Sequence, residues 1–267
     1  MRLLDGLELA GFIKERQLKA VRNLRQEHGI VPKLAIVRTN PNPIVDSYMR
    51  LKQRYGNDVL IDVDVHNIGQ GAALDLITSL NSDQSVHGII VQIPLPDVSQ
   101  TTEVLDAVSI YKDVDGLASG SVFDPATPMA INWLLAGYNI EPRGKNVLIV
   151  GQGRLVGLPL AKIWRSSGVA IQTADKSTQD LASLVRSADI VVSATGVSGL
   201  ITADMIGPKA VIVDAGVATD SNGLVGDVAQ DVRQIDSITI TPEKGGVGPL
   251  TVCALFENVI QAVRQTI

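Results

Sequence analysis

The chain has only one cysteine, Cys253, and three histidines among its 267 residues. A single thiol excludes an intramolecular disulfide framework, and three scattered histidines indicate no metal cluster. The sequence also lacks an apolar run long enough to cross a bilayer, and its first residues lack the apolar core of a signal peptide. We therefore expect a cytoplasmic protein with no metal site and no membrane partner.

Excess positive charge is lacking too. The formal net charge is −5, and no basic stripe with interleaved aromatic residues is present, so we expect no nucleic-acid partner. Hydrophobic residues make up 45% of the chain and charged residues 19%, which is ordinary for a globular α/β protein. A chain of this length can form one large domain or two modest domains with real cores.

Segments with strand and helix character alternate along the whole chain. In the first half we predict strands at 34–37, 59–65 and 88–91, and helices at 7–27, 44–55 and 74–80. In the second half we predict strands at 146–150, 169–173, 189–193, 210–214 and 237–240, and an amphipathic helix over 252–263. This alternation favours parallel sheets with both faces covered. We expect two α/β domains flanking a ligand cleft: a substrate domain of residues 1–118 plus 250–267, and a Rossmann-like NAD(P)-binding domain of residues 119–249.

The dinucleotide prediction depends on residues 145–175. The strand at 146–150 leads into Gly151-Gln152-Gly153, and Gly157 opens an apolar helix. Glycines at such a junction let the backbone turn tightly and approach a pyrophosphate, whose negative charge is favoured by the N-terminus of the helix. Asp175 follows the second strand, where its carboxylate can accept hydrogen bonds from a ribose diol. A purely structural glycine turn is the less favoured alternative.

Candidate catalytic residues lie in the first half. Tyr48 and Lys52 are four apart in a predicted helix, so they share one face. Spacing alone favours a structural interpretation, in which Lys52 extends from the edge of a core stripe. That stripe would consist of Ile44, Tyr48, Leu51 and Tyr55.

Gln92 ends a predicted strand in the segment Val91-Gln92-Ile93-Pro94-Leu95-Pro96. Two prolines stop the strand there, and the carboxyl end of a parallel strand is where open α/β sheets bind ligands. A glutamine that merely caps the strand end is an equal alternative.

Two further segments contain candidate ligand-binding residues. In Lys112-Asp113-Val114-Asp115-Gly116 the acidic residues flank a short turn, and solvated turn formers are the default interpretation. The stretch from Thr241 to Thr251 contains Gly245, Gly246 and Gly248 directly ahead of the last helix. Such a loop suits a backbone that lies close to a flat ligand, although a tight interdomain crossing would also need it.

Taken together and in this order, these segments resemble the bifunctional methylenetetrahydrofolate dehydrogenase/methenyltetrahydrofolate cyclohydrolase family over nearly the whole chain. The resemblance implies oxidation of 5,10-methylenetetrahydrofolate by hydride transfer to a nicotinamide, followed by hydrolysis of the methenyl product to 10-formyltetrahydrofolate. It also suggests a homodimer formed through the nucleotide domain.

The resemblance further implies site residues by position. Lys52 would be the catalytic lysine of the hydrolytic step, Gln92 would hold and tune it, and Asp115 would grip the pterin ring. Tyr48 would stack on the aminobenzoyl portion, and Gly245 and Gly248 would line the folate cleft. The predicted cofactor-binding set is Gly151, Gln152, Gly153, Asp175, Lys176 and Val217.

The chain departs from the family pattern at several positions. This chain has Val45 where the family usually has a serine, Ala126 where it has a cysteine and Gln152 where it has an arginine. Asp175-Lys176 replaces a usual His-Ser pair, and Glu243-Lys244 replaces a usual Val-Pro pair. Asp175 favours the free 2′-hydroxyl of NAD over the 2′-phosphate of NADP, although Arg154, Lys176 and Ser177 lie close enough in sequence to hold a phosphate.

Three alternatives remain open from the sequence. The chain could be a dehydrogenase of the same two-domain architecture that acts on another substrate, or a relative that has lost one activity. It could instead be a non-catalytic dinucleotide-binding subunit, which would have no need of Lys52, Gln92 and Asp115 together.

Overall fold

The computed structural model describes the chain except residues 42, 221 and 222 and the side chains at 43–45, 219–220 and 223–224. The chain divides into two compact units. We call them the six-stranded unit, which comprises Met1–Ala10 and Thr127–Thr251, and the three-stranded unit, which comprises Gly11–Ala126 and Val252–Ile267. The unit boundaries fall within helices α1, α5 and α8, whose bounds are Gly6–His28, Ala126–Gly137 and Val247–Arg264.

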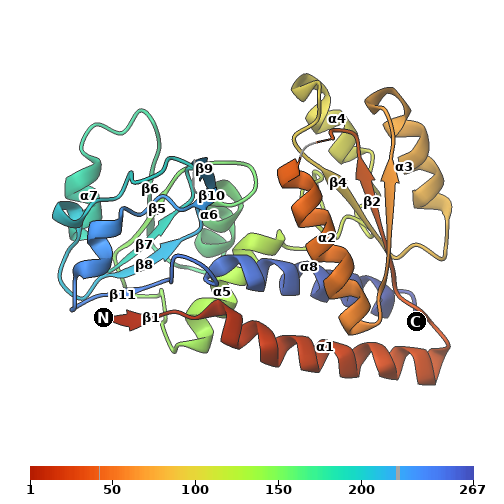
Figure 1. Ribbon diagram of the computed structural model, residues 1–267, viewed down its shortest axis with the longest axis horizontal. Helices are drawn as coiled ribbons and strands as arrows, with labels where there is room; N and C mark the ends of the chain where they lie inside the picture. The colour runs from red at the N-terminus through yellow and green to blue at the C-terminus, as the bar shows by residue number, and fades with distance from the viewer. Residues whose placement is uncertain (42, 221–222) are drawn as a thin grey trace. The chain divides into compact units, whose positions relative to one another are not determined.

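The six-stranded unit contains a parallel sheet with strand order β1-β11-β8-β7-β5-β6. Its strands, visible in Figure 1, are β1 (Arg2–Leu3), β5 (Val147–Val150), β6 (Ile171–Ala174), β7 (Ile190–Ser193), β8 (Val211–Asp214) and β11 (Thr239–Ile240). The order reverses between β5 and β7, the topological switch point at which doubly wound sheets bind ligands. Helices α6 (Gly157–Ser166) and α7 (Leu181–Ser187) and the antiparallel pair β9 (Ala218–Asp220) and β10 (Gly223–Val225) complete this unit.

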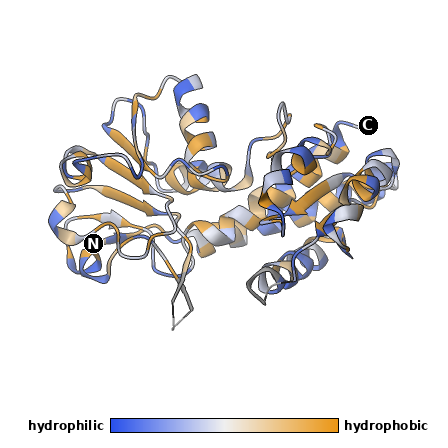
Figure 2. Cartoon of the chain, turned by 90° about the horizontal axis from the view of Figure 1, so that it is seen from above, coloured by the Kyte–Doolittle hydropathy of each residue, from blue (hydrophilic) through white to orange (hydrophobic). Residues whose placement is uncertain are grey.

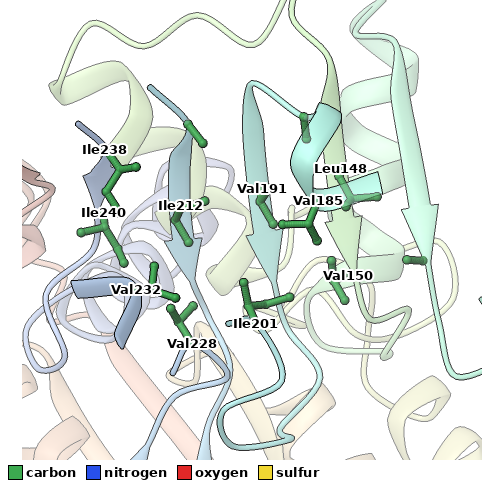
Figure 3. Close-up of a cluster of buried hydrophobic side chains, with 13 residues drawn as sticks. Leu148, Val150, Val185, Val191, Ile201, Ile212, Val228, Val232, Ile238 and Ile240 are labelled. Carbon is green, nitrogen blue, oxygen red and sulfur yellow. The ribbon is translucent and has the colours of Figure 1, made fainter. Parts of the chain in front are cut away.

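Branched aliphatic side chains form the core of this sheet. Val191 and Ile212 on neighbouring strands pack with Val185 of α7 and with Ile201 and Val232 from the connecting loops (Figure 3). Strands β5 and β7 are buried along their whole length, and Figure 2 shows the sheet strands mainly in the hydrophobic colour. Continuous apolar strands of this kind are typical of a parallel sheet that is covered on both faces.

The N-terminus differs from the predicted domain boundary. Residues 1–10 were expected in the substrate domain, but they belong to the six-stranded unit because β1 pairs in parallel with β11, with Arg2 opposite Thr239. The amide of Leu4 also donates to the carbonyl of Ile240 at 2.9 Å. A two-residue strand gives no periodic signal, so its partner is visible only in the folded chain.

The three-stranded unit has a parallel sheet with order β3-β2-β4, namely Asp62–Asn67, Lys33–Arg38 and Gly88–Gln92. Its helices include α2 (Pro43–Val59), α3 (Ala73–Ser82) and α4 (Thr101–Asp106), together with parts of α1 and α8. Short 3-10 turns lie at Gln70–Ala72 and Val98–Gln100 here, and at Ala203–Met205 and Gln230–Gln234 in the six-stranded unit. The β4 strand ends at Gln92, next to Arg38 at the end of β2.

At two places, residues predicted as strand or loop belong to a helix. The second strand was expected from Val59, but Val59 is the last residue of α2 and β3 begins at Asp62. The glycine-rich loop was expected to extend to Thr251, but α8 begins at Val247. Gly248 and Pro249 therefore lie in its first turn, where a proline loses no intrahelical hydrogen bond. No helix among the described residues has the length and apolar character needed to cross a membrane.

Candidate active site

The α2 helix presents Lys52 to the end of β4. The Nζ of Lys52 donates a hydrogen bond to Oε1 of Gln92 at 3.0 Å. The amide nitrogen of Gln92 donates to the carbonyl oxygen of Ile93 at 3.0 Å, which leaves Oε1 oriented as an acceptor. Gln92 is therefore more than a capping residue, because it holds the amine of a helix-borne lysine at the carboxyl edge of the sheet.

The charge state of Lys52 is perturbed. Burial of the amine lowers the pKa of Lys52, and the nearby carboxylate of Asp115 opposes this by favouring the ammonium. Burial raises the pKa of Asp115, and the charge of Lys52 partly counteracts that rise. A desolvated lysine beside a carboxylate, each with a perturbed pKa, is typical of acid–base sites.

The turn that contains Asp115 is built by tertiary contacts. Asp113 is only 3% exposed and its carboxylate accepts from the amide of Ala118 at 2.8 Å, so the expectation of a solvated turn former is wrong for this residue. Gly116 has φ of +70°, and a Cβ there would lie 2.7 Å from the backbone nitrogen of Pro125. From α8, Asn258 donates to the carbonyl of Val114 at 2.9 Å. These contacts fix the backbone on both sides of Asp115.

Tyr48 lies one turn before Lys52 on α2 and is half-buried, and burial raises the pKa of its phenol. The proposed core stripe is only partly present, because Tyr55 is buried whereas Leu51 is 45% exposed. The side chains of Ile44 and Val45 lie outside the described residues. Tyr48 and Lys52 therefore occupy a face of α2 that is not simply core.

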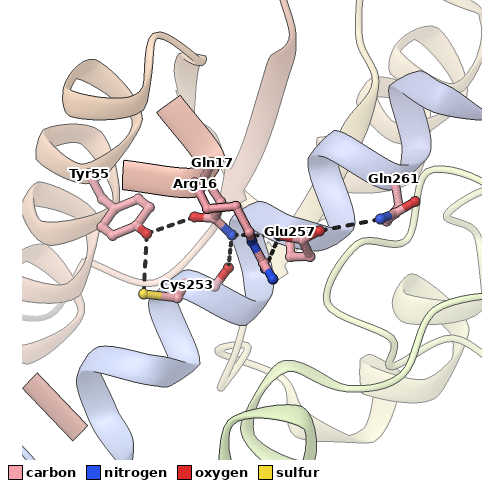
Figure 4. Close-up of polar contacts among 6 residues, drawn as sticks. All are labelled: Arg16, Gln17, Tyr55, Cys253, Glu257 and Gln261. Atoms are coloured by element: carbon pink, nitrogen blue, oxygen red, sulfur yellow. Dashed lines mark hydrogen bonds and ion pairs between the residues drawn. The ribbon is translucent and has the colours of Figure 1, made fainter. Parts of the chain in front are cut away.

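A buried polar cluster anchors α2 beyond Lys52 (Figure 4). The hydroxyl of Tyr55 donates to Oε1 of Gln17 at 2.7 Å and also lies 3.2 Å from Sγ of Cys253. The amide of Gln17 donates to the carbonyl of Cys253 at 2.8 Å and to Glu257 at 3.0 Å. This cluster ties α2 to α1 and α8 and so sets the rotation of the helix on which Lys52 lies.

In the six-stranded unit, the predicted phosphate loop follows β5. Gly151 has φ of +97°, and a Cβ there would lie 2.4 Å from the carbonyl oxygen of Ala194. A Cβ at Gly157 would lie 1.8 Å from the carbonyl oxygen of Gly151. Glycine is thus required at both positions, whereas a Cβ at Gly153 would meet nothing within 4 Å. The α6 N-cap residue, Val156, makes no side-chain capping bond, so this helix end suits an anion.

Asp175 is the first residue after β6. Its carboxylate accepts from the amide of Ser177 at 2.8 Å and from the Ser177 hydroxyl at 2.6 Å. These bonds, together with Lys176, lower the pKa of Asp175. Lys176 is exposed, and Gln152 turns its amide back to the carbonyl of Gly151 at 2.8 Å.

Val217 follows β8 and is 57% exposed. Leu155, Leu158 and Val197, on the segments that follow β5 and β7, are also exposed. Since the carboxyl ends of parallel strands share one edge of the sheet, these apolar side chains come from loops at the edge that contains the phosphate loop. Exposed apolar groups grouped in this way indicate a binding surface.

Gly245 and Gly248 belong to the six-stranded unit, whereas the other predicted substrate residues belong to the three-stranded unit. Gly245 has φ of +87° and its carbonyl accepts from the amide of Leu7 at 3.0 Å. A Cβ at Gly248 would meet nothing within 4 Å. The positive φ of Gly245 thus favours glycine there, whereas a side chain at position 248 would extend into open space.

Comparison with known proteins decides the family. Residues 4–115 match the family described as tetrahydrofolate dehydrogenase/cyclohydrolase, catalytic domain, and residues 125–267 match its NAD(P)-binding domain. The chain belongs to the tetrahydrofolate dehydrogenase/cyclohydrolase family. The resemblance read from the sequence motifs is thereby confirmed, as is the expectation of α/β units with a Rossmann-like NAD(P)-binding part.

Individual relatives span the same length as this member of the family. The bifunctional protein FolD of Nitratiruptor is 35% identical, with 99% of each chain covered. The crystal structure of the bifunctional FolD from Campylobacter jejuni has a TM-score of 0.95 at 33% identity, with full coverage of both chains. The dehydrogenase-cyclohydrolase of Trypanosoma brucei, determined with NADP and an inhibitor, has a TM-score of 0.92 at 28% identity and covers 99% of this chain and 97% of its own.

Several residues that shape the site were missed from the sequence. Asn258 and Gln17 act through contacts with segments far along the chain, and Asp113 through its bond to Ala118, five residues further on. Asp214, which ends β8, accepts from the amide of Asp227, which follows β10, at 3.0 Å. The one available signal was the presence of polar residues directly after apolar strands, which marks the carboxyl edge of a parallel sheet.

Proposed function

We propose that the chain oxidises 5,10-methylenetetrahydrofolate to 5,10-methenyltetrahydrofolate with NAD(P)⁺ and hydrolyses the product to 10-formyltetrahydrofolate. Membership of the tetrahydrofolate dehydrogenase/cyclohydrolase family over both halves of the chain supports this function. The observation that supports it most directly is the hydrogen bond between Lys52 and Gln92 beside Asp115. A dinucleotide-binding subunit without catalysis would need no desolvated lysine of this kind.

Lys52 is the acid–base group of the hydrolytic step. Water adds to the cationic methenyl carbon and releases one proton. The C–N5 bond of the resulting carbinolamine then breaks as the proton of its hydroxyl group passes to N5, which leaves the formyl group on N10. The neutral amine of Lys52 accepts a proton from the attacking water, and the lowered pKa makes this form more available at working pH. Gln92 is neutral, so it orients the amine without adding a charge. Its amide nitrogen is bound to the carbonyl of Ile93, which leaves Oε1 to accept from Lys52.

Asp115 binds the pterin ring, whose nitrogen donors suit a carboxylate acceptor. The raised pKa of Asp115, caused by burial, is consistent with a carboxylate that lacks water and is ready for such donors. Tyr48 supplies an aromatic face for the aminobenzoyl group. We also propose folate contacts at Gly245 and Gly248 of the six-stranded unit, where a Cβ at Gly248 would meet nothing within 4 Å.

The nucleotide occupies the carboxyl edge of the six-stranded sheet. Gly151, Gln152 and Gly153 would approach the pyrophosphate, the open space at Gly153 would allow close contact, and no side chain caps the N-terminus of α6. Val217 would lie against the cofactor with its exposed side chain, and Asp175 and Lys176 would contact the adenosine ribose. When bound, the cofactor accepts the hydride, while the protein aligns the partners and excludes water.

NAD is the preferred cofactor in this proposal. Asp175 is a charged acceptor for the ribose diol, and it repels a 2′-phosphate. Ser177 and Lys176 stabilise its ionised form. Gln152 occupies the position where the family usually has an arginine, so one potential phosphate ligand is lost.

One assay tests the whole proposal. Methylenetetrahydrofolate is supplied with NAD or with NADP, and methenyl formation and decay are followed by absorbance together with the reduced nicotinamide. We expect both phases, with faster hydride transfer to NAD. No reduced nicotinamide with either cofactor would reject the dehydrogenase, and stable methenyl product would show that the hydrolytic activity is lost.

We also propose that the protein is a cytoplasmic homodimer, as the family resemblance suggests. Light scattering coupled to size-exclusion chromatography would give the mass, and a species of 28.3 kDa, the mass of one chain, would contradict the dimer. Fractionation of the source cells would test the location.

A further inference from the structure

Two carboxylates lie buried at the cofactor edge of the six-stranded sheet, and the proposed mechanism does not use them. Asp214 ends β8, and Asp227 follows β10. Asp227 is fully buried and the side chain of Asp214 is 5% exposed. Charged side chains this deep are retained only where specific partners compensate for their lost hydration.

Asp227 holds the end of β7. Its Oδ2 accepts from the hydroxyl of Ser193 at 2.7 Å and from the backbone amide of Thr195 at 2.6 Å. The segment so held lies directly against the phosphate loop, because a Cβ at Gly151 would meet the carbonyl of Ala194 at 2.4 Å and Thr195 at 3.0 Å. Asp227 thereby sets the backbone on which Gly151 rests.

Asp214 holds the loop after β8 in the same way. Its carboxylate accepts from the amides of Gly216, Asp227 and Val228 at 3.2, 3.0 and 3.1 Å. Arg233 approaches it at 3.9 Å and compensates part of the buried charge. Asp214 and Asp227 thus share one network across the ends of β7 and β8.

Gly216 shows how closely this network underlies the cofactor edge. A Cβ there would lie 2.0 Å from Oδ1 of Asp227, and that oxygen has no hydrogen-bond partner among the described residues. The next residue is Val217, the exposed apolar residue expected to contact the cofactor. The carboxylate of Asp227 is therefore in direct contact with the turn that precedes Val217.

From this geometry we propose that Asp227 is a positioning residue for the nucleotide. It acts through two loops: it fixes Thr195 against Gly151, and it supports the Gly216 turn that precedes Val217. The inference rests on the proposed function for the identity of the ligand, but its prediction concerns nucleotide affinity and is separable from catalysis.

The test compares Asp227→Asn with Asp180→Asn. Asp180 is an exposed carboxylate in the same unit that caps α7, and asparagine caps helices equally well. Both variants are assayed for nucleotide Kd by equilibrium titration, for nucleotide KM in hydride transfer, and for methenyl hydrolysis without nucleotide. Since hydrogen bonds to charged groups are worth more than neutral ones, we expect the Kd and KM of Asp227→Asn to rise about tenfold.

If Asp227 only stabilised the fold, its replacement would also impair methenyl hydrolysis. Hydrolysis depends on Lys52 in the three-stranded unit, so we expect it within about twofold of wild type in Asp227→Asn, as is usual for sites without shared partners. Asp180→Asn should leave all three quantities unchanged. A Kd for Asp227→Asn equal to that of wild type would overturn the proposal.

If Asp227→Asn does not fold, Gly216→Ala serves as the test in its place. Its Cβ would lie 2.0, 2.1 and 2.5 Å from Oδ1, Cγ and Oδ2 of Asp227, so the carboxylate must shift, and a raised Kd with intact hydrolysis supports the proposal. Loss of hydrolysis in both variants, or an unchanged Kd in Gly216→Ala, overturns it. If the wild-type chain binds nucleotide but transfers no hydride, the proposed function fails while the Kd comparison still tests Asp227.

Discussion

Replacement of Lys52 by methionine tests the hydrolytic chemistry most directly. Methionine keeps most of the apolar stem that passes along α2 but removes the amine that lies 3.0 Å from Gln92. A positioned acid–base group contributes about 10²- to 10⁴-fold to a rate, so methenyl hydrolysis should fall by about that factor. Lys19→Met, which makes the same change at an exposed position on α1, is the matched control and should hydrolyse at the wild-type rate.

The pH dependence of methenyl hydrolysis tests whether Lys52 acts as a base. The neutral amine accepts the proton, so hydrolysis should rise with pH as Lys52 loses its proton. Because burial lowers the pKa of Lys52 below its ordinary value of 10.5, this rise should be centred below pH 10.5. The carboxylate of Asp115 works in the opposite direction, since it stabilises the ammonium. In Asp115→Asn the rise should therefore move to lower pH.

Stopped-flow absorbance of methenyltetrahydrofolate at saturating concentration measures both effects, because saturation separates the rate from weakened binding in Asp115→Asn. Methenyl decay at the wild-type rate in Lys52→Met would refute the role of the lysine. A pH limb that stays in place or moves to higher pH in Asp115→Asn would refute the electrostatic coupling between the two residues.

Three further predictions concern the cofactor and the stability of α2. Asp175→Ser should raise activity with NADP relative to NAD several-fold, and an unchanged ratio of the two kcat/KM values would count against the ribose role of Asp175. Gly157→Ala should raise the nucleotide KM at least tenfold, because its Cβ would lie 1.8 Å from the carbonyl oxygen of Gly151; a wild-type KM would show that the loop adapts. Tyr55→Phe leaves buried Gln17 without its hydroxyl donor and should lower the free energy of unfolding by about 1–3 kcal/mol. Urea denaturation measures this loss, with exposed Tyr111→Phe as the control that should stay at the wild-type value.

The sequence by itself determined the local elements and the family. Apolar runs such as Ile190–Ser193 and Gly88–Gln92 give parallel strands because they are buried on both faces. Gly151 and Gly157 are recognisable because the backbone turn between a strand and a helix demands glycine at fixed spacing. Lys52 and Gln92 likewise lie in short sequence motifs, so the order of the motifs along the chain was enough to identify the family.

Only the tertiary structure decided which of these residues meet. The pairing of β1 with β11, the bridge between Ile89 and Asp113 and the bond from Asn258 to Val114 all join segments that are distant in sequence. The same is true of Asp227, whose partner Ser193 ends a different strand. Periodicity and turn preferences act over a few residues, whereas burial and charge pairing depend on which surfaces fold together. The lowered pKa of Lys52 is a product of the fold for that reason, because neither its desolvation nor the carboxylate of Asp115 beside it can be read from the helix in which it lies.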